Sequence, residues 1–133
     1  MVPLESFHCD KYALLTDPIV DLTFKWLLAK GEIKTKLYRE IIDKLKKLLA
    51  DNKAAFREGK WMIGDGEKIM MCDFFWGRIY TDMLNNENSF LTKLDRNEIL
   101  KEALEFKAFG DKFTEENKLW INRRERMGQE YNA

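Results

Sequence analysis

Histidine, cysteine and proline are scarce in this chain of 133 residues, which has one histidine, two cysteines and two prolines. With a single histidine, the sequence shows no recognisable Ser-His-Asp or Cys-His pairing, and no Gly-rich phosphate loop is present. We therefore expect no catalytic residues, no metal site and no cofactor. Cys9 and Cys72 lie far apart in the sequence, so a disulfide framework is not predicted, and a reducing compartment is favoured.

An excess of charge is also missing, because Lys+Arg and Asp+Glu both number 23. Proteins that bind nucleic acid usually carry a basic excess, so this class is disfavoured. No apolar run reaches about 18 residues, and no membrane span is predicted. The first residues show neither a signal peptide nor the arginine richness of a transit peptide, so we expect a cytoplasmic protein. Import into an organelle without a cleaved leader is left open.

The composition that remains is typical of one soluble domain. Charged residues make up 35% of the chain and apolar residues 45%, which is enough for one hydrophobic core. A chain of this length buries roughly two-thirds of its unfolded surface as a single domain. No linker rich in proline, glycine or serine divides the chain.

Residues 60–84 are the most apolar stretch and predict a buried central helix. A Gly-Asp-Gly turn at residues 64–66 precedes a segment that is apolar on nearly every side. Its apolar residues are Ile69, Met70, Met71, Phe74, Phe75, Trp76, Ile79, Tyr80, Met83 and Leu84. Asp73 is one of its few charges, and inside a domain its carboxylate needs a partner.

Four further helices are predicted around the central one. Thr16-Asp17-Pro18 is a helix start, and residues 33–49 show the strongest amphipathic period. Asp95 and Glu98 form a capping-box-like start for a later helix. A break, or a bend in one longer helix, is expected at residues 109–111, and Thr114 is expected to cap the segment that follows.

These patterns predict an all-α, five-helix bundle with one domain. No strand pattern and no internal repeat occur in the sequence. Residues 1–15 are expected to be an extended lead-in, residues 16–127 the helical domain, and residues 128–133 a tail.

The order of the motifs resembles the C-terminal all-helical domain of the glutathione S-transferase family, nearest to its sigma-like members. The motifs are KLYREIIDKLKKLLADN, WMIGD, CDFFWGRIY and FKAFGDKFTEENKLWINRRE, and the resemblance covers residues 16–127. In that family a hydroxyl residue and an aspartate three positions later cap the buried helix. Asp73 matches the aspartate, whereas Met70 stands in place of the hydroxyl and the Gly-Asp turn lies two residues farther away. The resemblance implies that Asp73 is a structural helix cap.

The resemblance leads to two hypotheses about function. Transferase chemistry needs an N-terminal thioredoxin-like half, and about 16 residues before the first helix leave no room for it. The first hypothesis is therefore a non-catalytic interaction domain in a larger complex, with a protein partner on the face that this half would bury. A homodimer is one version of this arrangement. The alternative is the hydrophobic-substrate half of a glutathione transferase, in which case glutathione is the cofactor. Leu22, Phe24 and Trp26 are the candidate cleft or partner face under both hypotheses.

Overall fold

A computed structural model of the chain describes residues 3–119 and 121, and every regular element among them is helical. The predicted all-α bundle is confirmed. The elements in chain order are α1 (Pro3–Leu14), α2 (Asp17–Leu28), α3 (Gly31–Asp51), the 3₁₀ helix η1 (Lys53–Ala55), α4 (Met71–Arg78), the π-helical η2 (Ile79–Leu84), α5 (Lys93–Glu102) and α6 (Leu104–Glu116).

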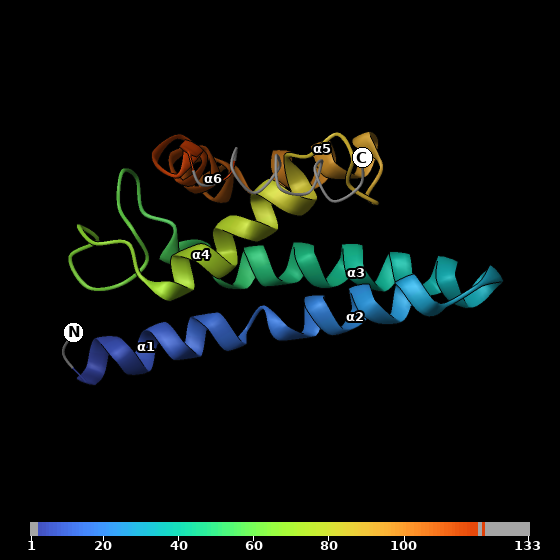
Figure 1. Ribbon diagram of the computed structural model, residues 1–133, viewed down its shortest axis with the longest axis horizontal. Helices are drawn as coiled ribbons and strands as arrows, with labels where there is room; N and C mark the ends of the chain where they lie inside the picture. The colour runs from blue at the N-terminus through green and yellow to red at the C-terminus, as the bar shows by residue number, and fades with distance from the viewer. Residues whose placement is uncertain (1–2, 120, 122–133) are drawn as a thin grey trace.

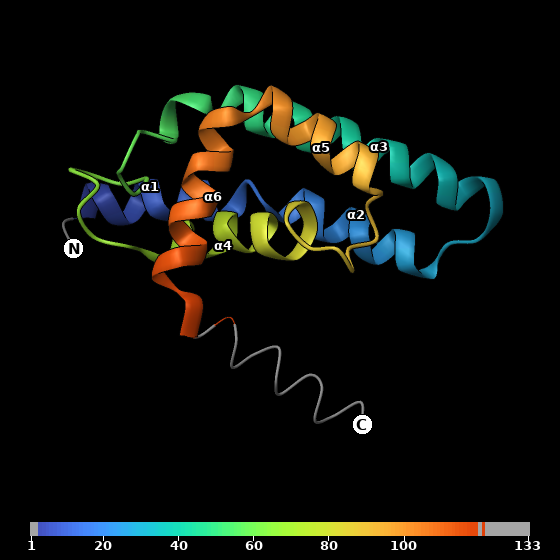
Figure 2. The ribbon, with the colours of Figure 1, turned by 90° about the horizontal axis from the view of Figure 1, so that it is seen from above.

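The helices form two layers connected by an oblique helix (Figure 1). In the first layer α1 and α2 follow one another end to end, and α3 returns alongside α2. From the α1 end, α4 rises toward the second layer, which contains α5 and α6. Seen from above, α5 lies along α3 while α6 crosses α4 (Figure 2).

Residues 1–15 were predicted to be extended, and this prediction is wrong because residues 3–14 form α1. Cys9 is the buried residue of this helix, and Trp76 Nε1 donates a hydrogen bond to the Tyr12 carbonyl oxygen at 3.0 Å. The Thr16 hydroxyl donates back to the Ala13 carbonyl oxygen at 2.8 Å and makes no side-chain cap for α2. The helical period is hard to recognise because the large apolar residues of α1 face solvent.

The buried central helix begins later than expected, at Met71, and continues as η2 to Leu84. Trp76 is completely buried in it. The Phe56 ring packs edge-on at 5.3 Å from Trp76 and 5.1 Å from Phe106, distances typical of favourable aromatic pairs. This aromatic cluster connects α4 to α6 and forms the centre of the core.

The boundary between the last two helices differs from the prediction. The chain breaks at Ala103, not at residues 109–111, and α6 runs unbroken through Gly110. The Thr114 hydroxyl donates to the Gly110 carbonyl oxygen within α6, so Thr114 does not cap a new helix. Most of the last predicted helix beyond residue 119, and the tail at 128–133, lie outside the described residues.

Candidate interaction surface

Asp73 lies at the third position of α4, where its carboxylate connects two segments. Its Oδ2 accepts a hydrogen bond from the Met70 backbone N–H at 2.8 Å, and Oδ1 accepts one from the Met62 N–H at 3.0 Å. Burial raises the pKa of Asp73, while the two N–H donors and the nearby Arg57 oppose that rise. Asp73 therefore acts on the fold, by fixing the start of α4 against the loop before it.

The loop at residues 61–66 presents the Met62 N–H to this carboxylate. The Trp61 N–H donates to the Gly66 carbonyl oxygen at 2.9 Å, which closes the loop on itself. Gly66 has φ +76°, and a Cβ there would lie 2.6 Å from the Lys60 Cβ, so only glycine fits. The longer Gly-Asp turn of this sequence thus still places a backbone donor beside the helix start.

Leu22, Phe24 and Trp26 do not share one face of α2, so the predicted common cleft or partner face is wrong. Leu22 and Trp26 lie one turn apart, whereas Phe24 lies on the other side of the helix. Leu22 is buried in the core, and the half-buried Trp26 ring packs 4.5 Å from the Phe90 ring. Phe24 is 61% exposed, so it alone of the three is largely available to a partner.

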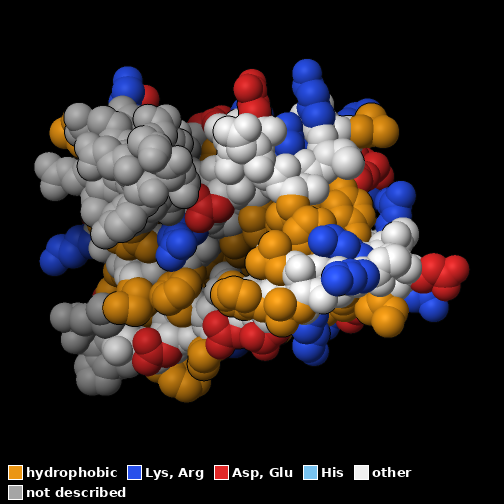
Figure 3. Space-filling view, turned by 45° about the vertical axis from the view of Figure 1, so that its right-hand side comes forward, with side chains coloured by type: hydrophobic (Ala, Val, Ile, Leu, Met, Phe, Trp, Pro, Cys, Tyr) orange, Lys and Arg blue, Asp and Glu red, His pale blue; other side chains and the backbone are white. Residues whose placement is uncertain are grey.

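A larger exposed apolar set follows α1 and α2. Seven of the thirteen exposed large hydrophobic residues in the described part of the chain belong to these two helices. They are Leu4, Phe7, Leu14, Val20, Phe24, Leu27 and Leu28, and together we call them the α1–α2 apolar residues. Single exposed apolar residues are ordinary, but many on two consecutive helices are typical of a binding surface. Figure 3 shows one face of the molecule on which hydrophobic side chains gather in a broad band.

Only Phe24 of this set was singled out from the sequence. The residues of α1 were missed because the segment was assigned as extended. The spacing of Leu4, Phe7 and Leu14 by three and seven positions was the available signal, since it places all three on one side of a helix.

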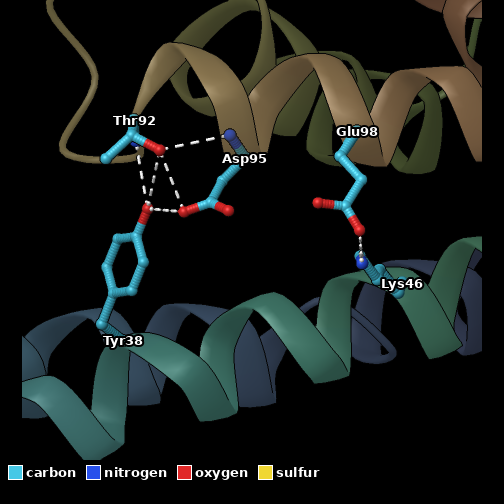
Figure 4. Close-up of polar contacts among 5 residues, drawn as sticks. All are labelled: Tyr38, Lys46, Thr92, Asp95 and Glu98. Carbon is cyan, nitrogen blue, oxygen red and sulfur yellow. Dashed lines mark hydrogen bonds and ion pairs between the residues drawn. The ribbon is translucent and has the colours of Figure 1, made fainter.

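A polar cluster joins α3 to the start of α5 (Figure 4). The Tyr38 hydroxyl donates to Asp95 Oδ2 at 2.5 Å, and Thr92 Oγ1 accepts from the Asp95 backbone N–H at 3.2 Å. Thr92 is therefore the N-cap residue, three positions before the predicted start. Glu98, expected in a capping box, instead pairs with Lys46 at 2.7 Å. These contacts hold α3 and α5 together.

A hollow of about 840 Å³ lies among η2, the following loop, α5 and α6. Three of its polar groups bond to one another, since the Tyr80 hydroxyl and Lys107 Nζ both donate to the Asp111 carboxylate. Arg96 donates to the Leu91 carbonyl oxygen at 2.8 Å. Within the described residues, no three metal-ligating side chains gather, and no helix has the length and apolarity to cross a membrane.

No family model, curated protein or solved structure matches this chain.

Proposed function

We propose that this chain is a non-catalytic helical interaction domain that binds a protein partner through the α1–α2 apolar residues, as a subunit of a larger complex. The observation that carries this proposal is the concentration of exposed large hydrophobic side chains on two consecutive helices. Burying one such side chain fully is worth about 1.5–3 kcal/mol, so a partner that covers several of them gains substantial affinity.

The resemblance to transferase helical domains supports the same proposal. In those domains a thioredoxin-like half covers part of the helical surface, and a helical domain used alone needs another protein there. The alternative, half of a glutathione transferase with glutathione as cofactor, predicts that the partner of this surface is a thioredoxin-like fold. The two proposals differ in what binds the chain.

Substitution of Phe24 tests the proposed surface. We expect the Phe24→Ser chain, tagged and purified from its native source, to lose about 10–100-fold in affinity for the partner, since a buried phenylalanine contributes about 1.5–3 kcal/mol. Size-exclusion chromatography with light scattering should show the wild-type chain in a species larger than 15.9 kDa and the variant as a monomer.

Leu104→Ser is the matched control, because Leu104 is similarly exposed but lies on α6. This variant should stay in the complex. A wild-type chain that is monomeric from its native source, or equal losses in both variants, would contradict the proposal. Retention of the chain on immobilised glutathione would favour the transferase alternative.

A further inference from the structure

The two cysteines of the sequence meet inside the molecule. Cys9 lies on α1 and Cys72 on α4, and both are buried free thiols. The Cys72 backbone N–H donates a hydrogen bond to Cys9 Sγ at 3.3 Å across a separation of 63 residues. We propose that Cys9 and Cys72 form a reversible disulfide that links α1 to α4, with a low-molecular-weight disulfide such as oxidised glutathione as the oxidant.

The contact between backbone nitrogen and sulfur brings the two thiols within reach of each other. The nitrogen and the sulfur of Cys72 are attached to the same Cα, so a Cys9 sulfur 3.3 Å from this nitrogen is also near the Cys72 side chain. A disulfide needs two Cα atoms within about 7 Å and side chains directed toward one another. Both cysteines are on the contacting sides of packed helices, because both are buried.

The surroundings keep the Cys72 thiol protonated while the helices stay packed. Burial raises the pKa of the Cys72 thiol, and the neighbouring Cys9 thiol and Asp73 carboxylate raise it further. A protonated, buried thiol is a poor nucleophile. The exchange therefore takes place when α1 lifts from α4 or while the chain folds, and Cys9 on the outer helix reacts first.

The chemistry consists of two thiol–disulfide exchanges. The Cys9 thiolate attacks one sulfur of oxidised glutathione, so a mixed disulfide forms and one glutathione leaves as a thiolate that takes up a proton. The Cys72 thiolate then attacks the Cys9 sulfur of the mixed disulfide and releases the second glutathione. Two protein thiols are oxidised, and one glutathione disulfide is reduced to two thiols.

The disulfide would restrict the motion of α1 relative to α4. In the reduced protein α1 can separate from α4 in a local opening, at a cost below that of global unfolding. The disulfide closes a loop spanning 63 positions and prevents this separation. This inference does not depend on the proposed partner, because it concerns the inner side of α1 and not its exposed side.

Refolding in glutathione buffers tests the proposal. We expect the full chain, refolded from denaturant with mixtures of reduced and oxidised glutathione, to lose two hydrogens in intact mass as the mixture becomes more oxidising. Alkylation after denaturation should then label neither cysteine, and one proteolytic fragment should contain both. The melting temperature should rise in the oxidised form and return after treatment with dithiothreitol.

Cys9→Ser is the control, because serine keeps a small polar side chain at the contact with the Cys72 N–H. In the same buffers this variant should gain one glutathione at most and show no rise in melting temperature, while circular dichroism confirms that it is helical. Two alkylatable thiols in the wild-type chain at every buffer composition, or a disulfide only between separate chains, would overturn the proposal.

Discussion

Asp73 shows how backbone N–H groups can supply the hydrogen bonds that a single buried charge needs. Its side chain is fully buried, and its two oxygens take one N–H each from Met70 and Met62. A carboxylate at the third position of a helix also interacts favourably with the positive end of the helix dipole. Met70 has no hydroxyl to complete a capping box, so the side chain that accepts a hydrogen bond at the start of α4 is that of Asp73.

Removal of this carboxylate should therefore destabilise the whole protein. We expect Asp73→Ala to lower the free energy of unfolding by about 2–3 kcal/mol, because two backbone donors lose their acceptor and at least one of them is buried. Urea denaturation followed by circular dichroism measures this change. Asp43→Ala, on the exposed side of α3, is the control and should change the free energy by less than about 0.5 kcal/mol. Equal effects of the two substitutions would show that Asp73 has no special role.

At the scale of elements, two glycines allow helices to approach closely. A Cβ at Gly110 in α6 would lie 2.2 Å from Cγ of the Tyr80 ring, and one at Gly77 in α4 would lie 2.5 Å from the Phe113 ring. Both glycines occupy helix interiors, where glycine is normally about 1 kcal/mol worse than alanine. The close packing of α6 against α4 and η2 thus outweighs local helix propensity.

In α6, alanine should therefore be less stable than glycine at position 110 and more stable than glycine at position 108. We expect Gly110→Ala to lower the free energy of unfolding by about 1–3 kcal/mol, because the added methyl group overpacks the contact with Tyr80. Ala108→Gly, at an exposed position of the same helix, should cost about 1 kcal/mol through propensity alone. Thermal and urea unfolding of both variants measure these effects. A stabilised Gly110→Ala variant would show that the helices have room at this contact.

At the scale of the whole molecule, polar contacts help to connect the two layers. The hydrogen bond from Tyr38 to Asp95 and the ion pair between Lys46 and Glu98 both run from α3 to α5. The hydrogen bond from Tyr38 is the main cause that lowers the pKa of Asp95 below its usual value of 3.8. A carboxyl group with a lowered pKa in the folded state stabilises the protein above its unfolded pKa, and this contribution is lost as the pH falls through the folded pKa.

Loss of the Tyr38 hydroxyl should therefore have an effect that depends on pH. We expect Tyr38→Phe to cost about 1–2 kcal/mol of unfolding free energy at pH 7, because a hydrogen bond to a charged acceptor is lost. The difference from wild type should shrink as the pH falls below about 3.8, where the unfolded carboxyl is protonated. Urea unfolding at several pH values checks this. In an Asp95→Asn background the cost of Tyr38→Phe should not change with pH, and a pH-independent cost in the wild-type background would contradict the assignment.

The sequence predicted the elements whose apolar residues face inward. In α3, Ile41, Leu45 and Leu49 repeat at helical spacing and are all buried, so the amphipathic stretch at residues 33–49 was recognised as a helix. In α1 the inner side consists of weakly apolar residues around Cys9, and the helical spacing of Leu4, Phe7 and Leu14 lies on the exposed side, so the helix was missed. Gly110 stays within an unbroken α6 and packs against the Tyr80 ring, a tertiary contact that local sequence does not encode.

The candidate surface was less predictable than the fold. The sequence marked apolar residues of α2, but it could not tell which of them the core would bury, because that depends on where α3 and the loop containing Phe90 pack. The contact between Cys9 and Cys72 likewise follows from the fold of α1 against α4, so spacing in the chain carried no information about it.

Trp26 and Trp76 occupy distinct environments, and each can serve as an optical probe of one region. Trp76 is fully buried, and its indole N–H bonds to the Tyr12 carbonyl oxygen on α1, so its emission should respond when α1 separates. Trp26 is half-buried, with the Lys34 ammonium 4.2 Å from the centre of its ring, and it reports on the far end of α2 and α3. Fluorescence of single-tryptophan variants can therefore follow opening of the two ends of the first layer separately, without an attached dye.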